Sequence, residues 1–141
     1  MSAAETANLA VSASVAANCT ITTAPVAFGG YDPIVTNTSA ALDQTGTVSV
    51  RCTNGSATTV TLGEGGNFST TRRMVSGLNF LAYELYSDAS REQIWGESAE
   101  SDVAHTGTGT VTGLTVYGRI PGAQNVPVGT YADTVVATVT F

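Results

Sequence analysis

Residues 8–17 read NLAVSASVAA and place an apolar side chain at every second position. Leu9, Val11, Ala13 and Val15 alternate with small or polar residues, which is the period of a β-strand with one apolar face. A terminal segment is usually poorly ordered unless it is tied into a larger structure. The pattern therefore predicts a strand that needs a sheet to join, and this sheet need not belong to the same molecule.

The composition indicates one all-β domain. The chain has 141 residues, of which 43% are hydrophobic and only 11% are charged, against roughly 25% charged residues in average globular domains. Thr and Val are frequent, and both suit the pleated surface of a sheet. The length fits a single domain with a substantial core. The net charge of −6 argues against a nucleic acid or an anionic membrane as a partner.

Turn signals divide the chain into about seven strand-like segments, and none keeps a helical period over three turns. Residues 46–52 are predicted to form a strand, and the Asn54-Gly55 turn predicts a hairpin with a partner strand through Val60 and Leu62. Further strands are expected within residues 78–86, 94–95, 111–120 and 128–141, and loops at residues 36–45, 63–76 and 96–108. This spacing favours a sandwich of two antiparallel sheets, with a closed barrel as the lesser alternative.

The two cysteines, Cys19 and Cys52, lie in segments of alternating apolar residues and are expected to point inward. In an oxidising compartment they would pair and close a loop of about 34 residues, which stabilises a fold by about 3–4 kcal/mol. Two buried free thiols are the alternative. A zinc site is disfavoured because the chain has no CxxC motif and only one histidine.

No arrangement of residues indicates catalysis or metal binding, so we expect no enzyme activity, no cofactor and no metal. His105 is expected to be solvated in a polar loop, and no Gly-x-Ser-x-Gly motif accompanies the serines. The acidic residues lack the spacing of a calcium loop; they include Asp32, Asp43, Asp88, Glu97, Glu100 and Asp102. Asp133 interrupts an inward-facing apolar alternation and is expected to cap a turn at the end of a sheet.

Five segments, in this order, resemble one known family. They are L-x-V-x-A-x-V-x-x-x-C-T at residues 9–20, P-x-x-F-G-x-Y-D-P at 25–33, G-x-V-x-V-x-C at 46–52, L-x-Y-x-L-Y-x-D at 81–88, and G-x-Y-x-D-x-V-x-A-x-V-x-F at 129–141. Together they resemble the spore coat U family, which includes the pilin subunits of archaic chaperone–usher pili such as the Csu pilus. The resemblance spans essentially the whole chain. No single segment is specific, and the occurrence of all five in order makes the resemblance strong.

The resemblance implies an incomplete immunoglobulin-like antiparallel β-sandwich at residues 18–141, preceded by a donor-strand extension at residues 1–17. The open groove of such a domain is filled first by a strand of a periplasmic chaperone and then by the N-terminal strand of the next subunit, a form of β-augmentation. The donor side chains would be Leu9, Val11, Ala13 and Val15. The strand that borders the groove and faces the chaperone would carry Tyr131, Val135, Ala137, Val139 and Phe141. In the alternative interpretation, the N-terminal strand folds back as an edge strand of its own domain.

The function that the resemblance implies is that of a structural subunit of a pilus or surface coat, a homopolymer built by strand donation. Such a subunit is exported through the periplasm, passes an outer-membrane usher, and ends in an extracellular fimbrium or on a cell or spore surface without entering a membrane. Residues 1–5 lack the basic start of a signal peptide, and we expect a mature chain behind an added Met. The alternative is a tip adhesin that binds a surface or carbohydrate through Trp95, Tyr83, Tyr86 or residues 63–76.

Overall fold

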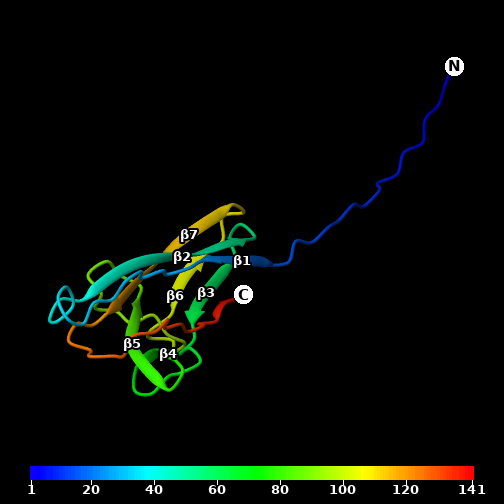
Figure 1. The fold of residues 1–141 in the computed structure, drawn as a ribbon. Coiled ribbons are helices and arrows are strands. Elements are labelled where there is room, and N and C mark those ends of the chain that lie inside the picture. The colour runs from blue at the N-terminus through cyan, green and yellow to red at the C-terminus, as the bar shows by residue number, and fades with distance from the viewer.

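Two antiparallel sheets pack face to face in the computed structural model, which describes residues 1–141 (Figure 1). The strands are β1 (Cys19–Ala24), β2 (Leu42–Cys52), β3 (Ala57–Leu62), β4 (Arg72–Ser76), β5 (Asn79–Tyr86), β6 (Val103–Thr106), β7 (Val111–Ile120) and β8 (Ala137–Thr140). One sheet has the order β1-β2-β7-β5-β4 and the other the order β6-β3-β8. The predicted all-β, immunoglobulin-like sandwich is confirmed, with eight strands rather than about seven.

The core lies between the two sheets and is built from alternate residues of their strands. On the larger sheet, Val48 and Val50 of β2 face Val60 of β3 across the interior, and all three are buried. Trp95 follows β5 and is only 1% exposed. Its indole N–H donates a hydrogen bond to the carbonyl oxygen of Val60 at 2.9 Å, so the one polar atom of this large side chain is satisfied inside the core.

The Asn54-Gly55 turn does not form the predicted hairpin. β2 pairs with β1 and β7, whereas β3 pairs with β6 and β8. The turn instead carries the chain from one sheet to the other, with Gly55 at a φ of 82° and its N–H donating to the carbonyl oxygen of Gly107. Alternation predicts which face of a strand is buried, but two strands with inward apolar faces can either pair or oppose each other across a sandwich.

Three segments that were expected to be loops contain strands. β4 lies within residues 63–76, β6 lies within residues 96–108, and β2 begins at Leu42. In β4 the Arg72 side chain is buried because its guanidinium donates to the carbonyl oxygens of Leu62, Gly63 and Trp95 and pairs with Glu84 at 2.6 Å. Arg72, one of the residues that indicated an exposed loop, is buried here because its guanidinium nitrogens find partners.

The predicted disulfide between Cys19 and Cys52 is confirmed, and the alternative of two free thiols is excluded. The two residues are directly opposite each other in the pairing of β1 with β2. The bond bridges 33 positions of the sequence and fixes the outermost strand of the larger sheet to its neighbour.

We expect Cys52→Ser to lower the free energy of unfolding by about 3 kcal/mol, because the unfolded chain regains the entropy of an open loop. The measurement is urea unfolding followed by circular dichroism under oxidising conditions. Reduction of the unmodified chain should cause a loss of similar size and serves as the control. Equal stability of the variant and the oxidised parent would contradict a stabilising bond.

Candidate functional site

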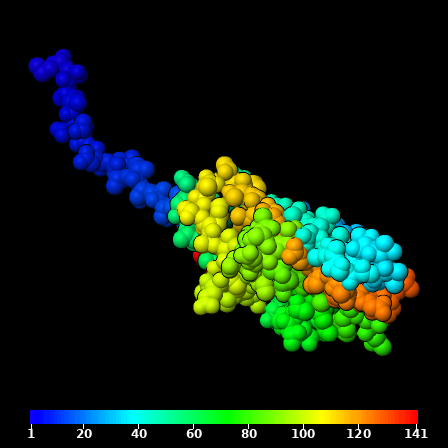
Figure 2. Space-filling model, turned by 90° about the vertical axis from the view of Figure 1, so that its left-hand side faces the viewer, coloured from blue at the N-terminus to red at the C-terminus, as the bar shows by residue number.

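The N-terminal segment projects away from the sandwich as an extended chain (Figures 1 and 2). Residues 1–18 belong to no strand, and Leu9, Val11 and Val15 are 84–87% exposed. Contact with the body begins at its base, where the N–H of Asn18 donates to Oγ1 of Thr53 at 2.9 Å. The tail is therefore not an edge strand of its own domain in this structure. Its apolar edge is left in solvent, which is the usual mark of an interaction site.

An apolar groove of about 970 Å³ opens along one side of the sandwich. Residues 23–31 line one wall and residues 125–135 line the other. The floor is the side of the core that faces the groove; it is made by Val48, Leu62, Met74, Leu81, Tyr83, Leu85, Val116 and Ile120. Hydrophobic residues make up 20 of the 32 lining residues, so the groove suits apolar side chains.

The groove opens beside two sheet edges. β1 is an edge strand of the larger sheet, and β8 is an edge strand of the smaller one. Asn18 directs its carbonyl oxygen toward Thr53, and antiparallel pairing alternates, so Cys19, Ile21 and Thr23 direct their backbone groups away from β2. An unpaired edge of this kind is ready to accept another strand.

The second wall is an extended segment with little pairing of its own. Between residues 125 and 136 its backbone makes one isolated bridge, Ala132 with Val75, one local hydrogen bond from Val126 to Gln124, and one hydrogen bond from the N–H of Gly63 to the carbonyl oxygen of Val136. Its inward side chains include Tyr131, Val135 and Ala137, which line the groove. Val139 packs against the core beyond the end of the groove. Phe141 is 56% exposed.

Two residues that the sequence reasoning missed form part of the first wall of the groove. Val26 lies over Gly46, and Phe28 lies over Gly118, where an added Cβ would meet the phenyl ring at 2.8 Å. The glycines leave the space that these side chains occupy. The available signal was the apolar alternation of Val26 and Phe28, which is one residue out of phase with Cys19 and Ile21 of β1 and was interpreted only as a turn-rich corner.

Asp133 ties the second wall to the floor of the groove. Its carboxylate accepts hydrogen bonds from the hydroxyl of Tyr83 at 2.5 Å and from the N–H of Gly66 at 2.9 Å. The second bond caps a turn, as expected. Burial raises the pKa of the Tyr83 phenol, and the hydrogen bond to Asp133 raises this pKa further. Tyr131 fixes the same wall at the mouth of the groove, since its hydroxyl donates to the carbonyl oxygen of Pro127 at 2.7 Å.

The other candidate residues do not assemble into a site. No group of three or more His, Cys, Asp or Glu residues is placed to hold a metal ion, and no helix has the length and apolar character needed to cross a membrane. His105 lies in β6 rather than in a solvated loop, and its Nε2 atom is buried without a hydrogen-bond partner. Trp95 and Tyr83 are buried in the core, so neither presents its ring to an external ligand.

We expect Tyr83→Phe to lower the free energy of unfolding by about 2 kcal/mol at pH 7, because Asp133 loses a hydrogen-bond donor. The raised pKa also predicts an alkaline effect. Above pH 10 the unfolded chain releases the phenol proton while the folded chain keeps it, so stability falls as the pH rises. Urea unfolding at pH 8 and at pH 11 measures both effects.

Tyr131→Phe is the matched control, because it removes a hydroxyl whose acceptor is a neutral carbonyl. We expect its stability to fall with alkaline pH as steeply as that of the parent chain, and the stability of Tyr83→Phe to fall less steeply. Identical slopes for Tyr83→Phe and the parent would contradict the role given to the Tyr83–Asp133 bond.

Comparisons with known proteins show the family and the fold of this chain. The solved chaperone–tip adhesion subunit complex CsuC–CsuE, from the archaic chaperone–usher Csu pili of Acinetobacter baumannii, matches with a TM-score of 0.66 and 22% identity. The match covers 90% of this chain and 40% of the solved chain, and it shows a common fold. Protein U of Myxococcus xanthus is 40% identical over 151 residues, covering 96% of this chain and 84% of the relative. Residues 5–138 match the Spore Coat Protein U domain, and the chain belongs to that family.

Proposed function

We propose that this chain is a structural subunit of a surface fibre or coat that polymerises by strand donation. Residues 1–17 act as the donor strand, and residues 18–141 form the acceptor sandwich. One observation carries the proposal: the chain holds an exposed, extended segment with an apolar edge and, in the same molecule, an open apolar groove beside the edge strand β1. Neither feature has a partner within the monomer, and the apolar edge of an extended chain is suited to an apolar groove.

The apolar edge of the tail matches the apolar lining of the groove. From Leu9 to Val15 an extended strand covers about 20 Å at 3.3 Å per residue. The four side chains of its apolar edge enter the groove, and its backbone pairs with the free edge of β1. Burial of one Leu and two Val side chains, with a smaller gain from Ala13 and the hydrogen bonds, offers about 6–10 kcal/mol before ordering costs. This is enough for a lasting joint between subunits.

Filling of the groove by the tail of the same molecule is opposed by the geometry at its base. To lie beside β1, the tail would have to reverse direction at residues 16–18. The backbone there is extended, and Asn18 is held to Thr53 through both its N–H and its carbonyl oxygen. Donation to a second molecule needs no such reversal.

A vacant groove requires protection before assembly. Exposed strand edges and apolar grooves promote aggregation, so the subunit needs a temporary partner that supplies a strand. The solved relative is a complex of a subunit with its chaperone, and this supports a periplasmic chaperone as that partner here. By the same reasoning an outer-membrane usher exchanges the chaperone for the next subunit, and the polymer lies on the cell or spore surface.

The family is that of the Spore Coat Protein U domain, and the solved structure with the same fold is a complex of a chaperone with a tip adhesion subunit. The adhesin alternative finds less support in the side chains that were its candidates. Trp95 and Tyr83 are in the core, and Tyr86 is half-buried. In residues 63–76 the two arginines are engaged, because Arg72 is buried and Arg73 stacks on Phe80 with its guanidinium carbon 3.8 Å from the ring centroid.

Deletion of residues 1–17 should abolish polymerisation and leave the sandwich folded, because the tail makes only marginal contact with it. The deleted chain should still capture a synthetic peptide of residues 1–17, measured by fluorescence anisotropy. Polymer is measured as bands that resist detergent at room temperature and disappear on boiling. Polymers of normal length from the deleted chain would overturn strand donation.

A charge on the apolar edge of the tail should block assembly, whereas a charge on its other edge should not. We expect Val11→Asp to reduce detergent-resistant polymer at least tenfold, since an unpaired carboxylate would be buried in the groove. Ser12→Asp is the matched control, because it places the same group on the outward edge of the same strand. Equal polymer yields from the two variants would show that the apolar edge does not enter a groove.

A further inference from the structure

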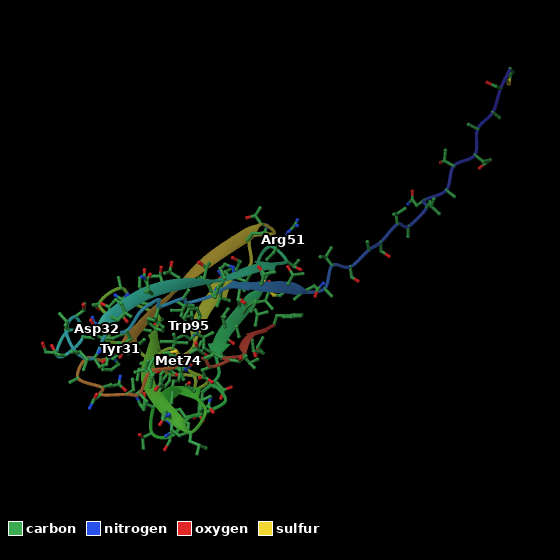
Figure 3. The ribbon with its side chains drawn as sticks, in the orientation of Figure 1. Tyr31, Asp32, Arg51, Met74 and Trp95 are labelled. Atoms are coloured by element: carbon green, nitrogen blue, oxygen red, sulfur yellow. A yellow bond between two sulfur atoms is a disulfide. The ribbon has the colours of Figure 1, made fainter.

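The two ends of the sandwich carry opposite and unpaired charges. We call the end from which the tail leaves the root pole; it includes Asn18, Arg51 and Thr53. The mouth pole is the opposite end, where the groove opens beside Tyr31 and Asp32. Figure 3 shows Arg51 at one end of the molecule and Asp32 at the other.

Arg51 is the only arginine that the domain leaves without an anion or an aromatic ring. Arg72 pairs with Glu84, while Arg91 and Arg119 pair with Asp43; Arg73 stacks on Phe80. Arg51 is exposed, and its Nε donates to the carbonyl oxygen of Gly109 at 2.9 Å. This bond fixes the guanidinium at the rim of a polar hollow of about 350 Å³ at the root of the tail. The rest of its donors are free for an acceptor outside the domain.

The mouth pole supplies an acceptor and an apolar surface. Asp32 pairs with no cation, and its Oδ1 accepts hydrogen bonds from the N–H groups of Ile34 and Val35 at 2.9 and 3.2 Å. These backbone bonds lower the pKa of Asp32, which stays ionised at neutral pH. Ile34 is 72% exposed, and Val128 is fully exposed; both lie at the lining of the groove. A charged residue beside exposed apolar ones is typical of an interface.

If strands are donated as proposed above, the length of the tail places the root pole of the donor next to the mouth pole of the acceptor. From Val15 to Cys19 the donor chain spans four residue steps, or about 13 Å, so the body of the donor lies close to the end of the groove at which its strand leaves. It cannot lie at the acceptor's root pole, because the acceptor's own tail leaves there. The donor strand therefore runs parallel to β1, and its body lies at the mouth pole.

We propose that the mouth pole of each subunit docks on the root pole of its donor, a second copy of this chain. Asp32 of the acceptor then faces Arg51 of the donor. Ile34 and Val128 of the acceptor pack against the base of the donor's tail and against Val111, which is exposed beside Arg51 in the pairing of β2 with β7. The contact sets the orientation of successive subunits and speeds their encounter, while the donated strand supplies most of the binding energy.

The test is a double-mutant cycle on the rate of polymer formation. Asp32→Asn keeps the acceptor for the Ile34 and Val35 N–H groups and removes only the charge, and Arg51→Gln removes the opposite charge. We expect each variant to assemble about two- to fivefold more slowly at low salt, in the range of an exposed ion pair. The double variant should be no slower than either single variant, and the differences should disappear at 0.5 M salt.

Glu100→Gln is the control, since it removes an exposed acid from the loop before β6. It should leave the rate unchanged. Additive effects of Asp32→Asn and Arg51→Gln, or an equal effect of Glu100→Gln, would overturn the docking. Capture of the peptide of residues 1–17 by the tail-deleted chain separates the two proposals. Normal capture with unchanged assembly rates would overturn the docking alone, whereas no capture would overturn strand donation and the docking with it.

Discussion

The open apolar groove between residues 23–31 and residues 125–135 is the constraint on which the other features of this chain depend. β1 and β8 adjoin its two walls and are edge strands of their sheets, so each leaves a row of backbone groups without a partner. The apolar floor of the groove lacks the cover that a further strand would give. A sandwich with an open groove is stable as a monomer only if strong bonds hold its strands together elsewhere. It stays soluble only if another strand soon covers the groove.

Two bonds hold the incomplete sandwich together at the places where a further strand would otherwise help. The Cys19–Cys52 disulfide fixes β1, which has a neighbour on one side only. Arg72 reaches from β4 of the larger sheet to the carbonyl oxygens of Leu62 and Gly63 at the end of β3 in the smaller sheet. A buried arginine with several carbonyl partners and a paired carboxylate joins the two layers through polar bonds, which cost little once every donor is satisfied.

The sequence predicted which face of each strand is buried better than it predicted which strands pair with each other. Alternation at Val48, Val50 and Val60 correctly indicated buried side chains, because period-two burial is a local property of a strand. The hairpin across Asn54-Gly55 was wrong because a turn signal does not state whether the chain stays in its sheet. Arg72 was missed because its burial depends on carbonyl groups that are distant in sequence. The tail of residues 8–17 stood out because an apolar edge needs no tertiary information to be recognised.

The source of the assembly energy can be argued from what is already buried. The floor residues Leu81, Tyr83, Leu85 and Val116 are only 4–6% exposed although the groove is open, because Val26, Phe28 and the second wall already shield them. These side chains have little accessible surface left to bury. The tail residues Leu9, Val11 and Val15 are 84–87% exposed, so most of the apolar area that the proposed donation would bury comes from the donor. Changes in the tail should therefore alter the strength of the joint more than changes of similar size in the floor, which act first on the stability of the monomer.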